Sequence, residues 1–190
     1  MIRETIVTTL NAQGQVHIAP MGVREADGQV ILAPFRPSTT LENVLSTGYA
    51  TVNLSDDVRV FAGCLTDRRN WPTLPCVRTA CVRLDGALAH RELRLARVEE
   101  DPQRPRLFMD LVHEETHRPF RGFNRAQGAV LECAILVSRL HMLPADKIDG
   151  ELAYLQIAID KTAGAEEREA WSWLLERIAA FRINRAIPDE

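Results

Sequence analysis

The first part of the chain alternates β-branched and apolar runs with turn residues, the pattern of strands joined by tight turns. Residues 2–10 are rich in Ile, Val and Thr, and the turn sequence NAQG follows at 11–14. Residues 16–23 predict a second strand, Asp27-Gly28 a hairpin, and residues 29–33 a third strand. Such a meander closes naturally into an antiparallel barrel, which leaves no exposed strand edge.

The middle of the chain continues with a short helix and further strands. Residues 40–47 carry Leu41, Val44 and Leu45 at helical spacing, and Gly48 is placed to end that helix. Strands are expected at residues 49–54, 76–84, 87–98 and 107–112, and the apolar run 58–65 precedes a proline-containing loop at 66–75. These segments supply about the six or more strands that a small barrel needs.

The hydrophobic period changes after Phe120. Apolar residues recur every three or four positions along residues 126–140, 151–161 and 165–184. These stripes predict three helices, whose apolar faces must pack on the barrel or on a partner subunit. The expected fold class is therefore α+β, with an antiparallel barrel at residues 1–120 and a C-terminal helical extension at 121–190.

Composition and charge narrow the functional classes. The 190 residues are 46% hydrophobic and 26% charged, with a formal net charge of -3. Because the charge is mildly negative and arginine is scattered, we expect neither a nucleic-acid nor a membrane partner. The sequence contains no apolar run of membrane-span length, and its start lacks the apolar region of a signal peptide, so we expect a cytoplasmic location.

The four cysteines, Cys64, Cys76, Cys81 and Cys133, show neither CxxC spacing nor a dense disulfide framework. We expect reduced thiols at all four positions, with Cys133 acting as a small hydrophobic residue on a helix face. We also expect no metal site.

Arg36-Pro37-Ser38-Thr39-Thr40 is the segment with the strongest chemical content. It places a guanidinium and three hydroxyls at the start of the predicted short helix, where backbone N–H groups lack intrahelical partners. A phosphate suits such a group of donors. The alternative is purely structural: Thr39 and Glu42 form a capping box, and Arg36 is a surface charge.

A second motif, His113-Glu114-Glu115-Thr116-His117, matches the HExxH zinc signature. That signature needs a helix that carries both imidazoles on one face. Here an apolar, strand-like run precedes it and Pro119 follows it closely, so a polar strand end running into a turn is expected. The sequence has no GxSxG elbow, no Walker loop and no GxGxxG after a strand.

Several motifs together resemble the FMN-binding split-barrel flavoproteins. They are HIAPMG at 17–22, APFR at 33–36, STT before the short helix, and ATVN at 50–53. RGFNRA at 121–126 resembles the branch of that superfamily long described only as a domain of unknown function. The resemblance spans nearly the whole chain and implies a flavin-reductase-like split barrel with FMN as cofactor.

The resemblance also implies positions for the cofactor. Arg36, Ser38, Thr39 and Thr40 would hold the FMN phosphate. The backbone around Ala19, Pro20, Met21 and Gly22, with Pro34 and Phe35, would lie against the isoalloxazine and ribityl chain. Asn43 and Asn53 could bond ring or ribityl oxygens. Because split barrels typically bind flavin at a homodimer interface, Arg121, Asn124 and Arg125 could complete the pocket from the partner; a plain helix start is their alternative role.

The resulting hypothesis is a flavin-dependent oxidoreductase that acts on an unknown small molecule. A non-catalytic flavin-binding or ligand-sensing protein of the same fold is the alternative, favoured by the missing dinucleotide motif. A zinc hydrolase that uses HEETH is a third hypothesis. No acid or base in the sequence stands out as catalytic.

Overall fold

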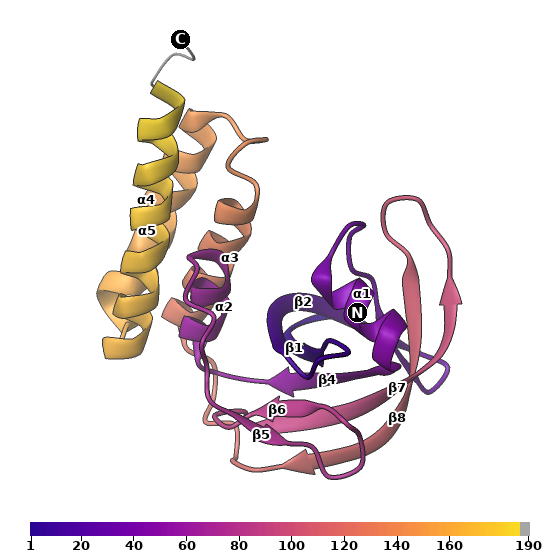
Figure 1. Ribbon diagram of the computed structural model, residues 1–190. Helices are drawn as coiled ribbons and strands as arrows, with labels where there is room; N and C mark the ends of the chain where they lie inside the picture. Colours follow the sequence, from indigo (N-terminus) through magenta and orange to yellow (C-terminus); the bar gives the residue numbers. More distant parts are fainter. Residues whose placement is uncertain (187–190) are drawn as a thin grey trace. The chain divides into compact units, whose positions relative to one another are not determined.

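The computed structural model describes residues 1–186 and contains two compact units (Figure 1). The first unit comprises residues 1–56 and 70–120, and the second comprises residues 57–69 and the chain from residue 121 onward. The first unit is the barrel and the second is helical.

The barrel is antiparallel throughout, as the meander pattern predicted. Its strands are β1 (Ile2–Leu10), β2 (Val16–Ala26), β3 (Gln29–Leu32), β4 (Tyr49–Leu54), β7 (Ala89–Glu99) and β8 (Arg106–Thr116). They close in the order β1-β2-β3-β8-β7-β4, and the pairing of β4 with β1 completes the ring. The short strands β5 (Thr73–Pro75) and β6 (Val82–Leu84) form a separate hairpin (Figure 1).

Helix α1 (Thr39–Thr47) belongs to the barrel unit. Ser38 caps its start, and Gly48 ends it with a left-handed φ of 79°, a conformation in which glycine has no Cβ penalty. The predicted capping box is therefore wrong: Ser38 is the N-cap, and Thr39 is already the first helical residue.

The two faces of the barrel wall differ in polarity. Val7, Val52, Leu93 and Met109 belong to the apolar core, and each is at most 1% exposed. On the opposite face, Thr51 pairs with Glu92 and Asn53 with His90, and all four are fully buried. The β5–β6 hairpin covers this polar face, because Thr8 Oγ1 donates to Val82 O and Leu84 N donates to Asn53 Oδ1.

The predicted strand at 76–84 is wrong over most of its length, since only residues 82–84 are extended in β6. Residues 76–81 instead bend around the carboxylate of Glu92, which accepts the backbone N–H groups of Val77, Arg78 and Thr79. In a strand, such N–H groups would donate to the carbonyl groups of a neighbouring strand.

The helical unit consists of α2 (Val58–Leu65), α3 (Arg125–Ser138), α4 (Ala145–Thr162) and α5 (Ala165–Ala186). The expected C-terminal helices are thus present, and the apolar run 58–65 joins them as a helix capped by Asp57. A shared core holds the unit together and includes Val130, Cys133 and Leu174, each fully buried. Among the described residues, no helix combines the length and apolar character required to cross a membrane.

Candidate functional site

The segment that leads into α1 lies against a distant turn. Arg36 N donates to Gln103 O at 2.8 Å, and the Arg36 guanidinium pairs with Glu100 at 2.9 Å. Arg104 Nε donates to Ala33 O at 2.8 Å. These bonds fix residues 33–36 to the 100–104 turn, and the Arg36 side chain remains exposed.

The hydroxyl groups at the start of α1 differ in exposure. Ser38 Oγ accepts from Leu41 N at 3.3 Å and so caps the helix. Thr39 is exposed in the first turn, whereas Thr40 is 2% exposed. The N–H groups of Thr39 and Thr40 lie in the first helical turn, where no intrahelical carbonyl is available to them. These hydroxyl and amide groups follow Arg36 directly in the chain.

Arg104 is a cationic residue that the sequence reasoning missed. Its guanidinium carbon lies 4.7 Å from the centroid of the Phe35 ring, which is 64% exposed. This arrangement places a second arginine next to the Arg36 segment. No local sequence signal joins residues 35 and 104, because the association depends on how the two loops pack.

The predicted residues of β2 lie along one stretch of the barrel wall. Ala19, Pro20, Met21 and Gly22 are all partly exposed. At Gly22 a Cβ would come within 2.8 Å of Ile2 Cγ2, so glycine permits the close approach of the β1 side chain.

The two predicted asparagines are engaged inside the barrel unit. Asn43 Nδ2 donates to Thr9 Oγ1 at 2.9 Å, which ties α1 to β1. Asn53 is fully buried; its Nδ2 donates to Ile6 O at 3.1 Å and its Oδ1 accepts from Leu84 N at 2.7 Å. A ligand would reach the Asn53 amide only by displacing these bonds.

The predicted partner-supplied residues lie in the helical unit. Asn124 caps α3 by accepting from Ala126 N at 2.7 Å, and it donates to Thr162 O at 3.1 Å. Arg125 is the exposed first residue of that helix, and Arg121 is also exposed. In the described chain Asn124 thus has the role of a helix cap.

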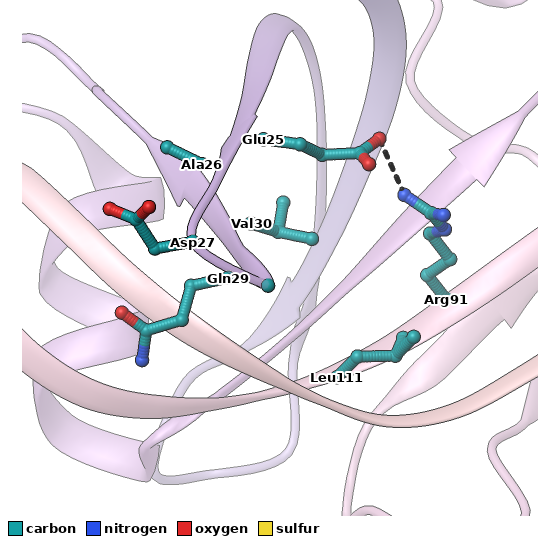
Figure 2. A pocket seen from close by; sticks show the side chains of 8 residues that line it. Glu25, Ala26, Asp27, Gln29, Val30, Arg91 and Leu111 are labelled. Atoms are coloured by element: carbon teal, nitrogen blue, oxygen red, sulfur yellow. Dashed lines mark hydrogen bonds and ion pairs between the residues drawn. The ribbon is translucent and has the colours of Figure 1, made fainter.

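An open pocket of about 230 Å³ lies at the β2–β3 turn and includes none of the predicted site residues (Figure 2). In Figure 2 the Arg91 side chain points toward Glu25, with which it pairs at 2.8 Å. Arg91 Nε also lies 3.3 Å from Glu114. Partial burial opposes the charge of Arg91, but these carboxylates outweigh it and raise its pKa. The charges of Glu25 and Arg91 at this pocket are therefore paired with each other.

Histidine side chains gather on the polar face of β7 and β8. Residues opposite each other in an antiparallel pair share a face, and His90 pairs with Glu115 while Glu92 pairs with His113. The ring centroids of His90 and His113 are 5.8 Å apart. His90 Nδ1 lies 2.9 Å from His117 Nε2. The HEETH motif is thus on a strand and its following turn, as its sequence context predicted.

Glu92 anchors this group of side chains. Its carboxylate accepts from Val77 N at 2.7 Å, from Arg78 N and Thr79 N at 2.8 Å each, and lies 3.3 Å from His90 Nε2. Burial acts against the charge of Glu92, but the backbone donors outweigh it and lower its pKa. Glu92 is therefore a buried carboxylate held ionised by its donors.

The cysteines of residues 76–81 border the same network. Cys76 Sγ lies 3.1 Å from Thr51 Oγ1, and Cys81 Sγ donates to Thr8 O at 3.5 Å. A hydrogen bond from the Cys76 thiol is the main cause that lowers the pKa of Cys81 to about 7. Cys64 and Cys133 lie in the helical unit, where burial raises their pKa values to about 11 and about 12.

Solved structures identify the class of fold. The chain is similar to the FMN-bound protein MM1853 of Methanosarcina mazei, with a TM-score of 0.78 and 18% identity over 93% of this chain and 94% of that one. It is also similar to the flavin reductase HpaC complexed with NADP+, with a TM-score of 0.56 and 17% identity over 65% of this chain and 82% of that one. The barrel thus has the fold of the flavin reductases.

The family follows from the sequence itself. Residues 3–118 match the family described as "Protein of unknown function (DUF447) N-terminal domain", and residues 124–176 match "Protein of unknown function (DUF447)". The chain therefore belongs to the DUF447 family. It is also 29% identical over 148 residues to the uncharacterized protein MJ1453 of Methanocaldococcus jannaschii, covering 74% of this chain and 75% of that one.

Proposed function

We propose that the protein binds FMN and acts as a flavin-dependent oxidoreductase on a small molecule. The observation that carries this proposal is the likeness in fold, over 93% of the chain, to a protein described as FMN-bound. When bound, the flavin supplies hydride or electron transfer, and the protein supplies binding, orientation and electrostatics.

The residues that lead into α1 fit a phosphate. Within residues 1–186 Arg36 is paired only with an exposed carboxylate, since the side chains of Arg36 and Glu100 are 43% and 73% exposed. An exposed ion pair of this kind contributes about 0–1 kcal/mol, so a phosphate can replace Glu100 at little cost. In the proposal Arg36, Ser38 and Thr39 hold the phosphate, with the backbone of Thr40 as a further donor.

The remaining contacts extend from this anchor. Phe35 and the β2 backbone from Ala19 to Gly22 would line the rest of the flavin, and Arg104 adds positive charge beside Phe35. We further propose a homodimer in which Arg121, Asn124 and Arg125 of the partner complete the pocket. Asn43 and Asn53 hold the barrel together in this proposal, because their amide groups already have buried partners.

The first test is the absorbance spectrum of the purified protein, followed by titration with FMN monitored by flavin fluorescence. We expect flavin absorbance and one FMN bound per chain. Protein that stays colourless and leaves FMN fluorescence unchanged would contradict the proposal.

Substitutions then locate the phosphate site. Arg36→Ala should weaken FMN binding by about 10- to 100-fold, because a charge-assisted contact contributes about 1.5–3 kcal/mol. Glu100→Gln should strengthen binding a few-fold, because it removes the competing carboxylate. Arg24→Ala is the matched control: Arg24 is an exposed arginine on β2, and its replacement should leave the affinity unchanged.

An activity assay separates the oxidoreductase from the ligand-sensing alternative. Turnover of NADH or NADPH by the FMN-loaded protein supports an oxidoreductase. Tight FMN binding without reduction of the bound flavin by either nucleotide supports a flavin-binding sensor.

A further inference from the structure

We propose that His90, His113 and Glu115 form a binding site for a divalent transition metal ion, with Glu92 as the residue that orients His90. Ligand atoms of His90, His113 and Glu115 all lie within 4.8 Å of one another. A tetrahedral metal with bonds of about 2.0–2.1 Å holds its donors about 3.4 Å apart, so modest side-chain rotation brings the three onto one ion.

The sheet register explains why these residues meet. His113 and Glu115 are two positions apart on β8, so their side chains project from the same face. His90 lies directly opposite Glu115 on β7. Side chains from two neighbouring strands therefore converge, and the ladder between the strands keeps them in place.

His113 has a buried atom that lacks a partner. The Nε2 atom of His113 is shielded from solvent and has no hydrogen bond among the described residues. Glu115 Oε2 lies 3.7 Å from this atom, which is beyond hydrogen-bonding distance. A buried polar atom without a partner costs about 1–3 kcal/mol, and coordination to a metal would supply the missing interaction.

His90 is oriented as a metal ligand. Its Nε2 faces the Glu92 carboxylate at 3.3 Å, and this pair is fully buried. A hydrogen bond from Nε2 to a carboxylate leaves the lone pair on Nδ1, and this pairing of carboxylate with histidine is the arrangement that supports metal-bound imidazoles. Nδ1 lies 2.9 Å from His117 Nε2, and a bound ion would take the place of this hydrogen bond.

The donor set selects the class of ion. Imidazole nitrogens with a carboxylate oxygen suit Zn²⁺, Co²⁺, Ni²⁺ and Cu²⁺ better than Mg²⁺ or Ca²⁺. His90 is fully buried, whereas the side chains of His113 and Glu115 are 28% and 49% exposed, so an ion can reach the site from solvent.

A second grouping, Cys76, His90 and Glu92, shares His90 with the proposed site. In that grouping the Glu92 oxygens already accept hydrogen bonds from the backbone N–H groups of Val77 and Arg78. The Cys76 thiol is also already within 3.1 Å of Thr51 Oγ1. These contacts indicate that Glu92 orients the ligand His90 and does not itself coordinate the ion.

The proposal differs from the helical zinc signature in a testable way. On a helix, Glu114 would lie between the two histidines and act with the metal. On the strand, Glu114 points to the opposite face and lies 3.3 Å from Arg91 Nε. Glu114 and Glu115 are similarly exposed, at 42% and 49%, so each is a matched control for the other.

The experiment uses the full chain without an affinity tag, stripped of metal with a chelator. Zn²⁺ binding is measured by titration calorimetry, and Co²⁺ serves as a probe through its visible absorption. We expect one ion per chain. Glu115→Gln and His113→Ala should weaken Zn²⁺ binding at least tenfold and change the Co²⁺ spectrum.

Control variants make the outcome decisive. Glu114→Gln and His141→Ala, an exposed histidine of the helical unit, should bind Zn²⁺ like the original protein. Circular dichroism and urea unfolding of each variant separate lost binding from lost folding.

Three results would overturn the proposal: no stoichiometric Zn²⁺ or Co²⁺ binding, unchanged binding in both Glu115→Gln and His113→Ala, or loss of binding in Glu114→Gln alone. None of the proposed ligands is a proposed FMN contact. The metal and flavin proposals therefore succeed or fail separately.

Discussion

The segment that leads into α1 and the polar face beneath the β5–β6 hairpin are both rich in hydrogen-bonding groups, but they use them differently. Arg36 and Thr39 are exposed, and Arg36 forms an ion pair with the exposed carboxylate of Glu100. Beneath the hairpin, Glu92 and Asn53 are fully buried and bonded to backbone groups of other segments. Donors left at the surface are available to a ligand, whereas donors and acceptors inside the polar face hold the chain together. Substitutions should therefore separate binding from stability.

Glu92→Ala should have the largest effect on stability. It leaves the N–H groups of Val77 and Arg78, which are partly buried, and of Thr79, which is buried, without their acceptor, and we expect a loss of about 3–5 kcal/mol in the free energy of unfolding. Urea denaturation monitored by circular dichroism measures the loss. A change below about 1 kcal/mol would show that residues 76–81 do not depend on the carboxylate.

Glu92 also predicts a direction for the effect of pH. Its pKa is lowered in the folded state, so its contribution is fully present above its unfolded value near 4.5 and is lost as the pH falls through the lowered folded value. In Glu92→Gln the free energy of unfolding should therefore fall less steeply as the pH is lowered below 5. The slope of that free energy against pH should decrease by an amount on the order of one proton. If the free energy of unfolding of the variant depends on pH below 5 as it does in the original protein, other carboxylates cause that dependence.

Asn53→Ala should have the next largest effect. Asn53 connects β1 to β6 through Ile6 O and Leu84 N, and its removal leaves a buried donor unsatisfied. We expect a loss of about 2–3 kcal/mol in the free energy of unfolding. Asn70→Ala, at an exposed asparagine of the same unit, should change that value by less than about 0.5 kcal/mol.

Ser38→Ala tests the boundary between the two regions, because Ser38 caps α1 and is also a proposed phosphate contact. Loss of the cap should lower the free energy of unfolding by about 0.5–1 kcal/mol. This value is at the low end of the range for helix caps because the bond from Leu41 N to Ser38 Oγ is long, at 3.3 Å. FMN affinity should fall as well. Ser38→Asp should retain the cap but weaken FMN binding, because its carboxylate repels the phosphate.

Arg36→Ala should have the smallest effect on stability, below about 0.5 kcal/mol, because it removes only an exposed ion pair. The same variant carries the largest expected loss of FMN affinity. Unfolding and FMN titration on one preparation measure both values. A loss of stability above about 2 kcal/mol would show that Arg36 serves the barrel itself and would remove the contrast between the regions.

The local sequence predicted most of the barrel. Alternation and turn residues gave β1, the hairpin at Asp27-Gly28 and β4, and the helical stripes gave the C-terminal helices. Strand context also placed HEETH correctly, because Pro119 and the preceding apolar run leave no room for a helix. Motif resemblance predicted the split-barrel class, which the fold comparison confirms.

The structures of residues 58–65 and 76–81 could not be predicted from local sequence patterns. Residues 76–81 have the sequence pattern of a strand, but the Glu92 carboxylate accepts hydrogen bonds from their backbone N–H groups, which are then not available for pairing with another strand. The run 58–65 is apolar throughout, and apolar runs of this length do not distinguish a strand from a buried helix. Residues 58–65 form a helix because they pack with α3 and α5 in the core of the helical unit.

Sequence alone thus determined the order of elements, because turn chemistry and hydrophobic period act over a few residues. Tertiary structure alone decided which distant groups meet: Arg104 with Phe35, Glu100 with Arg36, and His90 with the histidines of β8. The physical reason is that sheet register and loop packing set those distances. Both depend on the closure of the whole barrel, which no short stretch of residues encodes.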